Sequence, residues 1–437
     1  MFKDKPVYMN IPEVNLPRIV VIGCGFAGLK FTKRINSRKY QVVLIDKNNY
    51  HTFQPLLYQV ASSGLAPDSI VYPIRKIFKG KPNFYFRMAS VEHISTKDQL
   101  VQTNIGSIHY DRLVIATGAT NNFFGMENIE QHAMPMKSLT ESLDLRSMIL
   151  QNFEEALNTN DLEERNRLMN FVIVGGGPTG VELAGALSEL RSHVLPNDYP
   201  DLDFRRMQIH IVEAGSRVLG AMSTHASEKA MRALDKFGVQ VWLDTRVEDY
   251  DGKTVMTSKS DFASKTMIWA AGIQAAVPGG ILVKKGMGNR ILVDAFNAVE
   301  GMDQVYSIGD VAQIHSTKYP DGNPMLASVA EQQGAHLAKN LNKMAVGKPF
   351  IPFTYKDKGT MATIGRNKAV VDLPFWKFAG FFGWLTWMFV HLMLLVDFRS
   401  RLVVFVDWVY SYIRYDKGTR LIVRKAGTFR KQEQGFD

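Results

Sequence analysis

Residues 19–28 read Ile-Val-Val-Ile-Gly-Cys-Gly-Phe-Ala-Gly, an apolar run that leads directly into a glycine-rich turn. Residues 171–180 repeat the arrangement as Phe-Val-Ile-Val-Gly-Gly-Gly-Pro-Thr-Gly. In each copy the apolar run predicts a buried strand, and the glycines let the backbone approach a pyrophosphate group. The helix that should follow supplies free N–H groups and the positive end of a dipole. Two copies in one chain predict two dinucleotides and electron transfer between them.

The sequence around these loops predicts an α/β fold of two Rossmann-like dinucleotide-binding domains, the second inserted in the first. The apolar run 305–308 ends at Gly309 and Asp310, a pattern that indicates a strand returning the chain to the first domain. Other expected elements are a β-rich stretch at 84–120, a helical stretch at 140–168, a helix from Val181 to about Leu195 and a loop insertion at 195–206. The predicted boundaries are 1–122 and 289–345 for the first domain, 123–288 for the second, and 346–437 for a C-terminal region.

An acidic residue follows the second predicted strand of each domain. Asp46 comes after 42–45, at the spacing at which a carboxylate accepts hydrogen bonds from the adenosine ribose. Glu213 comes after 209–212, and a carboxylate there favours NADH because it repels a 2′-phosphate. Arg217 stands close by and opposes that preference.

Composition excludes several classes of protein. A chain of 437 residues with 46% hydrophobic residues has enough apolar material for two or three globular domains. Cys24 is the only cysteine, which excludes a disulfide framework, a cysteine-based metal site and a redox dithiol. No metal site is predicted. Residues 1–10 are polar, so no secretory signal is expected.

The formal net charge of +10 is concentrated towards the C-terminus. The basic residues there are Arg399, Arg401, Arg414, Lys417, Arg420, Arg424, Lys425, Arg430 and Lys431. They alternate with aromatic and aliphatic residues, which favours an anionic membrane surface over nucleic acid as the partner.

The stretches 375–396 and 402–414 are the strongest membrane signal. They hold four of the six tryptophans, and Trp and Tyr prefer the headgroup level of a bilayer. The first stretch is long enough to span a membrane, but Gly380, Gly383 and its many aromatic residues favour a pair of interfacial helices. A buried dimer interface would be equally aromatic, and the two interpretations are compatible.

These features together resemble the two-dinucleotide-binding flavoproteins and, among them, the type II NADH:quinone oxidoreductases. The segments that carry the resemblance over the whole chain are 49–58 (Asn-Tyr-His-Thr-Phe-Gln-Pro-Leu-Leu-Tyr), 177–182 (Gly-Pro-Thr-Gly-Val-Glu), 330–334 (Ala-Glu-Gln-Gln-Gly) and 384–412. The resemblance implies non-covalent FAD at the first glycine loop and NADH, as substrate, at the second. It assigns FAD to Gly23, Gly25, Phe26, Ala27, Gly28, Asp46, Lys47, Thr117, Gly118, Gly309 and Asp310. It assigns NADH to Gly175, Gly177, Pro178, Thr179, Gly180, Glu182, Glu213, Ala271 and Gly272.

The resemblance also implies a quinone site, with one departure from the family pattern. Its catalytic candidates are Glu182, beside the nicotinamide, with Ser328 and Gln332; its quinone-binding candidates are Gln54, Tyr58, Ser328, Glu331, Gln332 and Lys377. The family motif Ala-Gln-x-Ala-x-Gln reads Ala-Ser-Val-Ala-Glu-Gln at 327–332, so Ser328 replaces the first glutamine. A hydroxyl can still form a hydrogen bond, directly or through water.

The function implied is oxidation of NADH through FAD and reduction of a membrane quinone (menaquinone or ubiquinone) without proton pumping. The enzyme is expected to be a homodimer on the cytoplasmic face of the inner (plasma) membrane, with no nucleic-acid partner. Disulfide reductases need a redox pair of cysteines and are excluded, because Cys24 is the only cysteine and lies inside a glycine loop; sulfide:quinone oxidoreductases are disfavoured for the same reason. Two alternatives stay open: an NADH-dependent reductase of a soluble protein acceptor, and a flavin-bearing sensor.

Overall fold

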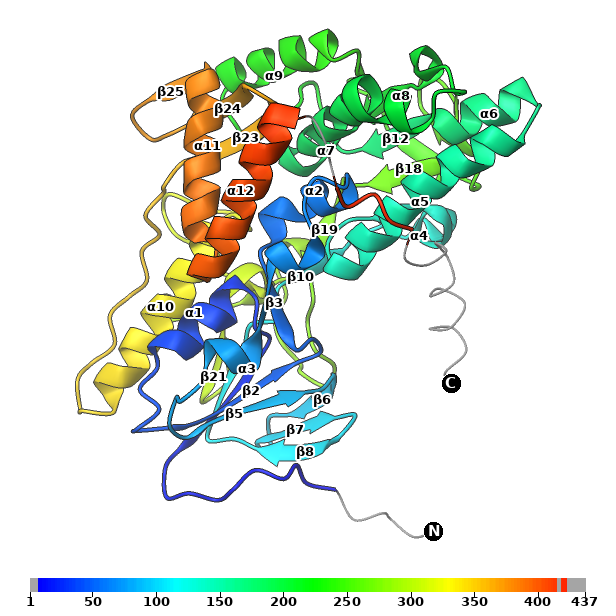
Figure 1. Cartoon of the computed structure of the whole chain (residues 1–437). Helices are drawn as coiled ribbons and strands as arrows, with labels where there is room; N and C mark the ends of the chain where they lie inside the picture. Colours follow the sequence, from blue (N-terminus) through cyan, green and yellow to red (C-terminus); the bar gives the residue numbers. More distant parts are fainter. Residues whose placement is uncertain (1–6, 415–417, 423–437) are drawn as a thin grey trace, which may run out of the picture. The chain divides into compact units, whose positions relative to one another are not determined.

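The computed structural model describes residues 7–414 and 418–422 and divides the chain into two compact units (Figure 1). The first unit is made of Met1–His51, Tyr72–Thr120 and Ile273–Asp357. The second is made of Thr52–Val71, Asn121–Gly272 and Lys358–Asp437. Five basic residues of the predicted C-terminal cluster lie outside the described residues: Lys417, Arg424, Lys425, Arg430 and Lys431.

The first unit is built on a five-stranded parallel sheet with strand order β21-β9-β1-β2-β5. Its strands are β1 (Arg18–Ile22), β2 (Gln41–Asp46), β5 (Phe84–Met88), β9 (Arg112–Ile115) and β21 (Val305–Ser307). The Val- and Ile-rich runs are buried throughout β1 and β2, as in parallel sheets that are covered on both faces. The pairing of β21 with β9 confirms the predicted return of the chain to the first sheet.

Helices α1 (Phe26–Arg34) and α10 (Ala327–Met344) lie side by side in this unit (Figure 1). A Cβ on Gly334 would sit 2.3 Å from the backbone oxygen of Ala27, so a glycine is required where the two helices meet. The remaining elements of the first unit are α3 (Ile74–Ile77), β6 (Val91–Ser95), β7 (Leu100–Thr103), β8 (Gly106–His109), β19 (Ile273–Ala275), β20 (Ile291–Leu292) and β22 (Ala312–Gln313). Strands β6, β7 and β8 form an antiparallel sheet, which confirms that 84–120 is rich in strands.

A second five-stranded parallel sheet, with order β11-β18-β12-β13-β14, forms the core of the second unit. Its strands are β11 (Met134–Pro135), β12 (Phe171–Val174), β13 (Ile209–Val212), β14 (Gln240–Trp242) and β18 (Thr266–Trp269). Its helices are α2 (Leu57–Ala61), α4 (Glu127–His132), α5 (Leu139–Asn158), α6 (Leu162–Met169), α7 (Pro178–Glu189), α8 (Leu195–Asp198) and α9 (Thr224–Lys236). A small antiparallel sheet holds β15 (Val247–Tyr250), β16 (Thr254–Thr257) and β17 (Phe262–Ala263), and the short strands β3 (Tyr50–Thr52), β4 (Val71–Pro73) and β10 (Ala119–Asn121) lie at unit boundaries.

The second glycine loop opens into its helix three residues earlier than predicted. Helix α7 begins at Pro178, because a proline fits the first turn, where its missing N–H has no partner to lose. The helix changes to a π-helical turn at Leu190–Val194. The predicted loop at 195–206 was therefore wrong in part, since it starts with α8. The helical stretch at 140–168 is confirmed as α5 and α6.

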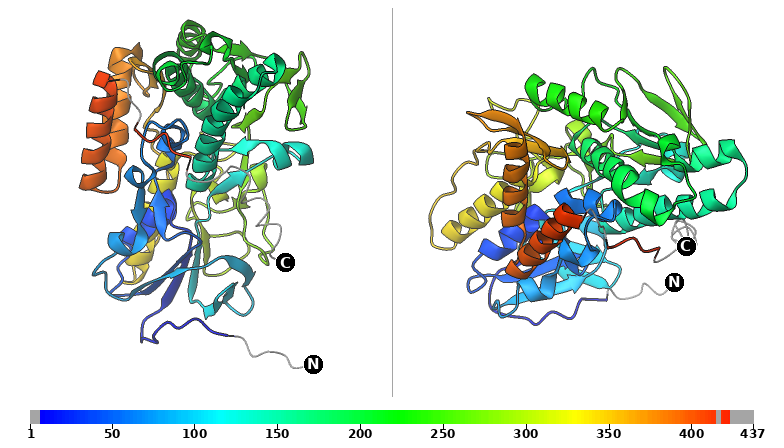
Figure 2. Two further views of the ribbon diagram at one scale, coloured as in Figure 1. Left: turned by 45° about the vertical axis from the view of Figure 1, so that its right-hand side comes forward. Right: turned by 45° about the horizontal axis from the view of Figure 1, so that its top comes forward.

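The C-terminal part of the second unit joins an antiparallel sheet to two helices. The sheet is β23 (Thr360–Gly365), β24 (Lys368–Asp372) and β25 (Lys377–Gly380), followed by α11 (Phe381–Leu394) and α12 (Phe398–Arg414). The apolar stretch 375–396 is thus not one continuous helix. Gly380, at a φ of 83°, ends the strand and opens α11, a conformation that other residues rarely adopt. The two helices run beside each other in both views of Figure 2.

Helices α11 and α12 carry many large apolar side chains that face solvent. The most exposed are Phe382 at 73%, Phe398 at 74% and Ile413 at 70%. Within residues 7–414 and 418–422, no helix has both the length and the apolarity needed to cross a bilayer.

Candidate functional site

The first glycine loop joins β1 to α1 in a turn that only glycines permit. Gly23 has a φ of +98°, and a Cβ on it would lie 2.4 Å from the backbone oxygen of Ala116. A Cβ on Gly28 would lie 1.9 Å from the backbone oxygen of Gly23. Gly25 differs, because a Cβ there would meet no atom of the described chain within 4 Å. Two glycines therefore make the turn, and the third leaves a space open beside the N-terminus of α1.

Asp46, at the end of β2, is hydrogen-bonded to this loop. Its carboxylate accepts hydrogen bonds from the backbone N–H of Cys24 at 2.6 Å and of Asn48 at 2.7 Å. Burial raises the pKa of Asp46, and these two N–H groups act in the opposite direction. The strand-end position of Asp46 is as predicted, and the structure adds that the carboxylate holds the loop itself.

His51 supports the same loop and was missed by the sequence interpretation. Its Nδ1 lies 2.8 Å from the backbone oxygen of Cys24, and its ring meets Phe26 edge-on at 5.4 Å. Burial lowers the pKa of His51 to about 4, so the imidazole is neutral at pH 7 and its Nδ1–H donates to the carbonyl. Cys24 is buried, and burial raises the pKa of its thiol, as befits a packed residue rather than a nucleophile.

The other residues predicted to hold FAD lie at the ends of β9 and β21. Thr117 follows β9, and its buried Oγ1 has no hydrogen-bond partner among the described residues. Gly309, at a φ of +80°, donates its N–H to the side-chain oxygen of Gln333 at 2.6 Å. Phe26, Ala27, Lys47, Gly118 and Asp310 complete the set: Ala27 is buried in the first turn of α1, and Lys47 is exposed after β2.

The second glycine loop repeats this geometry residue by residue. Gly175 has a φ of +111°, and a Cβ on it would lie 2.7 Å from the backbone of Ala270; a Cβ on Gly180 would lie 2.0 Å from the backbone oxygen of Gly175. A Cβ on Gly177 would meet nothing within 4 Å in the described part of the chain. Glu213 accepts from the backbone N–H of Gly176 at 2.6 Å and of Gly215 at 2.7 Å, as Asp46 does for the first loop.

A cavity of about 380 Å³ lies in front of this second loop. Its lining residues are Gly175, Gly177, Glu213, Gly215, Ser216, Arg217, Gly220, Ala270 and Ala271. Pro178 and Thr179 stand exposed in the first turn of α7. Gly272 follows the cavity wall, and a Cβ on it would lie 2.8 Å from the Phe124 ring. Of the predicted NADH residues, Gly175, Gly177, Glu213 and Ala271 thus line this cavity.

The Arg217 side chain contacts residues that follow it closely in the sequence. Its Nη2 donates to the backbone oxygen of Gly220 at 2.7 Å, and its Nη1 lies 3.5 Å from the Oγ1 of Thr224 at the start of α9. The guanidinium therefore braces the cavity wall.

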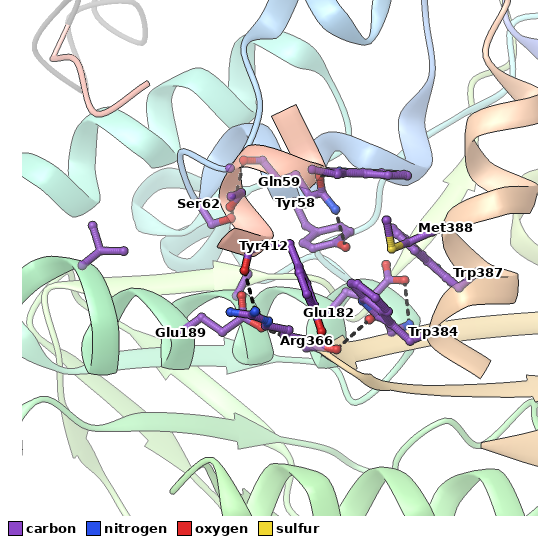
Figure 3. A pocket seen from close by; sticks show the side chains of 17 residues that line it. Tyr58, Gln59, Ser62, Glu182, Glu189, Arg366, Trp384, Trp387, Met388 and Tyr412 are labelled. Atoms are coloured by element: carbon purple, nitrogen blue, oxygen red, sulfur yellow. Dashed lines mark hydrogen bonds between the residues drawn. The ribbon is translucent and has the colours of Figure 1, made fainter. Parts of the chain in front are cut away.

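Glu182, on α7, lies in a different cavity of the same unit, of about 110 Å³ (Figure 3). Burial raises the pKa of Glu182 to about 8, although the backbone N–H of Thr363, at 3.3 Å, and the Trp387 indole both favour the charged form. The buried Trp387 Nε1 reaches no acceptor in regular hydrogen-bond geometry within the described residues. At pH 7 the carboxyl is largely protonated.

The cavity wall is aromatic and comes from segments far apart in the sequence. The lining residues are Tyr58, Gln59, Ser62, Gly64, Glu182, Ala186, Glu189, Val194, Thr363, Gly365, Arg366, Trp384, Trp387, Met388, Trp408, Ser411 and Tyr412 (Figure 3). Trp387 stacks on His391 with ring centroids 4.1 Å apart and meets Tyr58 edge-on at 6.5 Å. Burial lowers the pKa of His391 to about 4, so this ring is neutral. The sequence signalled the tryptophans as membrane residues and gave no sign that they enclose Glu182.

Of the quinone candidates in the second unit, only Tyr58 lines the cavity that holds Glu182. Tyr58 lines the cavity of Glu182, buried and hydrogen-bonded by the Gln59 amide at 2.9 Å. Gln54 precedes α2 and is exposed, and Lys377 is exposed on β25. Neither of these two lines the cavity.

The quinone candidates of the first unit lie on the N-terminal half of α10. The Ser328 hydroxyl lies 3.0 Å from the Tyr355 hydroxyl. The Gln332 amide donates to the backbone oxygen of Lys356 at 2.9 Å and accepts from its N–H at 3.0 Å. Glu331 forms an ion pair with Lys30 of α1 at 3.6 Å. All three side chains thus have partners within their own unit.

Comparison with known proteins places this geometry in a family. The family described as "Pyridine nucleotide-disulphide oxidoreductase" matches residues 17–334, and the "NDH2 C-terminal domain" matches residues 358–414. The chain is 32% identical to the type II NADH:quinone oxidoreductase Ndh of Mycobacterium tuberculosis over 418 residues, which covers 92% of this chain and 89% of that protein.

Two solved structures of NDH2 from Plasmodium falciparum share the fold. The complex with RYL-552 has a TM-score of 0.85 at 22% identity and covers 94% of this chain and 100% of its own. The complex with NADH has a TM-score of 0.84 at 21% identity and covers 93% of this chain and 100% of its own.

Proposed function

Because the chain belongs to the type II NADH:quinone oxidoreductases, within the pyridine nucleotide-disulphide oxidoreductase family, we propose that it oxidises NADH and reduces a membrane quinone. The observation that carries the proposal is the pair of glycine loops, each held by a strand-end carboxylate and each leaving one glycine open to an incoming group. In such folds the phosphates bind at the N-terminus of the helix that follows the loop.

The first loop is proposed to hold FAD without a covalent bond. The open space at Gly25 suits a diphosphate, and the unpartnered Thr117 Oγ1 suits a polar group of the cofactor. Asp310, at the end of β21, is proposed to bind the ribityl chain. When bound, FAD supplies the chemistry of taking a hydride from NADH and passing both electrons to quinone.

The second loop and its cavity are proposed to hold NADH rather than NADPH. Glu213 lines the cavity as a carboxylate, and a 2′-phosphate brought there would meet its negative charge. Arg217 lines the same cavity, with its guanidinium donating to the Gly220 backbone oxygen, and its positive charge opposes that preference. Glu182, Ala271 and Gly272 are proposed to contact the nicotinamide half.

The overall reaction takes NADH, one proton and quinone to NAD⁺ and quinol, with no proton moved across a membrane. Glu182 is protonated over much of the physiological range because of its burial, so we propose that it holds a proton beside the reacting groups. The quinone is proposed to contact Tyr58 and Gln54, Ser328, Glu331, Gln332 and Lys377. The quinone is proposed to be menaquinone or ubiquinone.

The exposed apolar faces of α11 and α12 are proposed to rest on a membrane surface. Burial of such side chains in the interfacial region would hold the protein at the bilayer without a spanning helix. The proposed location is the cytoplasmic face of the inner membrane, and the same aromatic region is proposed to take part in a homodimer.

Stopped-flow absorbance of the purified protein tests donor, cofactor and acceptor together. NADH should bleach bound flavin within one turnover, and menaquinone or ubiquinone analogues in lipid should restore the flavin absorbance. Absence of bleaching would remove NADH as donor. Bleaching that only a soluble protein acceptor reverses would favour the alternative, a reductase of such an acceptor.

A further inference from the structure

The carboxylate of Asp372, at the end of β24, holds the segment that forms one wall of the cavity at the second glycine loop. Its Oδ2 accepts the backbone N–H of Ser223 at 2.6 Å, and its Oδ1 accepts the Ser223 hydroxyl at 2.8 Å. Ser223 is the N-cap of α9, where its Oγ accepts the N–H of Ala226 at 3.2 Å. A single carboxylate thus engages both donors of the residue that begins α9.

Ser223 ends the cavity-wall segment, which we define as residues 214–223. Four of its residues line the cavity: Gly215, Ser216, Arg217 and Gly220. Glu213 fixes its first end through the N–H of Gly215, and the N–H of Leu219 donates to the backbone oxygen of Gly176 at 2.7 Å. Asp372 fixes the other end.

The cavity-wall segment contains a strained residue, so its shape depends on these fixed points. Leu219 is buried and has a φ of +52°, a left-handed conformation that is strained for a residue with a side chain. Such a conformation persists only where the surroundings hold it. Without Asp372, both Ser223 donors lose their acceptor, and the segment is free to relax away from the glycine loop.

We propose that Asp372 is a positioning residue for NADH, acting through Ser223 on the part of the cavity that takes the adenosine half of the dinucleotide. The inference rests on the proposed function, since it assumes that this cavity binds NADH. Asp372 is not among the residues that line the cavity, and it belongs to the sheet in which β24 pairs with β25, the strand that leads into α11. Helix α9 packs against β24 and β25 (Figure 1). The sheet next to the apolar helices therefore sets the position of the NADH cavity wall.

The test compares Asp372→Ala, Asp372→Asn and Ser223→Ala in the full-length flavoprotein. For Asp372→Ala we expect KM for NADH to rise about tenfold, with kcat at saturating NADH and the flavin content unchanged. The asparagine keeps one acceptor oxygen and can donate to the Ser223 hydroxyl, so it should restore most of the affinity. Ser223→Ala keeps the N–H bond and should give an intermediate rise. Glu248→Ala, an exposed acid on β15, is the matched control and should leave KM as in the wild type.

Calorimetric titration with ADP-ribose separates a positioning role from a general loss of structure. ADP-ribose affinity should fall by the same factor as NADH affinity, because ADP-ribose carries the adenosine and both phosphates of NADH and lacks the nicotinamide ring. An unchanged KM in Asp372→Ala, or a fall in kcat and flavin content in place of a rise in KM, would overturn the inference. If Asp372→Ala does not fold, the asparagine and Ser223→Ala variants decide by the same readouts. Failure of the wild type to bind NADH or ADP-ribose would instead refute the proposed function.

Discussion

The indole N–H of Trp408, on α12, donates a hydrogen bond of 2.8 Å to the side-chain oxygen of Gln59, on α2, across 349 residues of sequence. Gln59 forms a second hydrogen bond, in which its amide donates to the Tyr58 hydroxyl at 2.9 Å. Both bonds lie at the aromatic cavity that also holds Glu182. A polar bond in such a place is directional, so it fixes the position of α12 where apolar packing alone would allow it to slide.

Replacement of Trp408 by phenylalanine should destabilise the second unit. A smaller aromatic ring is kept, but the half-buried Gln59 oxygen loses its donor, and a lost hydrogen bond of this kind costs about 1 kcal/mol. Urea unfolding followed by tryptophan fluorescence and circular dichroism measures the change. Trp376→Phe removes an indole that is 67% exposed and should leave the unfolding midpoint within error. Equal shifts in the two variants would show that the Trp408–Gln59 bond adds no stability.

Stability should fall with rising pH because of Glu182. The pKa of this carboxyl is about 8 in the folded protein and near 4.5 when unfolded, so between these values the unfolded state releases a proton that the folded state keeps. The contribution of Glu182 to the free energy of unfolding is therefore fully present below pH 4.5. It is lost as the pH rises to 8, and the loss amounts in total to about a few kcal/mol. Glu182→Gln removes this dependence while it keeps the side chain's size.

The measurement for Glu182 is the free energy of unfolding of wild type and Glu182→Gln from pH 5 to pH 9. The two proteins should be similar at pH 5, and the variant should be the more stable at pH 9. A difference that does not change with pH would mean that the carboxyl titrates normally. Glu248→Gln, exposed on β15, should show no pH-dependent difference.

Substitution of Gly25 or Gly177 by alanine should impair the proposed FAD site and the proposed NADH site independently. Both glycines have negative φ values, −67° and −71°, and a Cβ on either would meet no described atom within 4 Å, so both variants should fold. The methyl group would instead occupy the space proposed for a diphosphate. Gly25→Ala should be purified with little flavin. Gly177→Ala should keep its flavin, but its KM for NADH should rise about tenfold or more, which is the loss in binding free energy expected for one contact to the diphosphate.

Flavin absorbance per protein and steady-state kinetics read out both glycine variants. The pair controls itself, since each variant should leave the other site intact. Gly28→Ala is the contrasting case, because its Cβ would lie 1.9 Å from a backbone oxygen and the first unit itself should be destabilised. Equal loss of flavin in Gly25→Ala and Gly177→Ala would contradict the assignment of the two loops.

Replacing exposed phenylalanines on α11 and α12 by charged residues should release the protein from lipid. Phe382 and Phe398 are each more than 70% exposed, and burial of a phenylalanine in an apolar phase contributes about 1.5–3 kcal/mol. Phe382→Glu and Phe398→Glu should each weaken sedimentation with vesicles of mixed phosphatidylcholine and phosphatidylglycerol about tenfold or more. Leu162→Glu on α6, where the side chain is 48% exposed, is the control. Undiminished sedimentation of both phenylalanine variants would place the lipid contact elsewhere.

Local sequence patterns were sufficient for the two nucleotide folds. The strand before each glycine loop, the acid after the second strand and the return strand β21 all follow from short apolar runs and glycine spacing, and the structure has them where they were expected. The start of α7 was predicted too late because Pro178 was assigned to the turn, although its fixed φ suits the first helical position.

Long-range packing could not be predicted in the same way. The cavity of Glu182 brings together α2, α7, β23, α11 and α12, and no local pattern reports that Gln59 meets Trp408. The same limit applies to Asp372, whose role depends on Ser223, 149 residues away in the sequence. The binding roles assigned to individual residues through the resemblance stay predictions, which the variants above test.

The interleaved construction of the second unit bears on how the protein is made in the cell. Thr52–Val71 leaves the ribosome early, while Trp408, which donates a hydrogen bond to Gln59, is synthesised 349 residues after Gln59. At about 5–20 residues per second, the intervening chain takes on the order of half a minute to appear. During that interval α2 can pack against α5 and α7, but the side-chain oxygen of Gln59 has no donor until Trp408 has been made, so the side of α2 that meets α12 is completed late. A ribosome stalled before residue 398 would hold a nascent chain that can complete its first sheet but not its second unit.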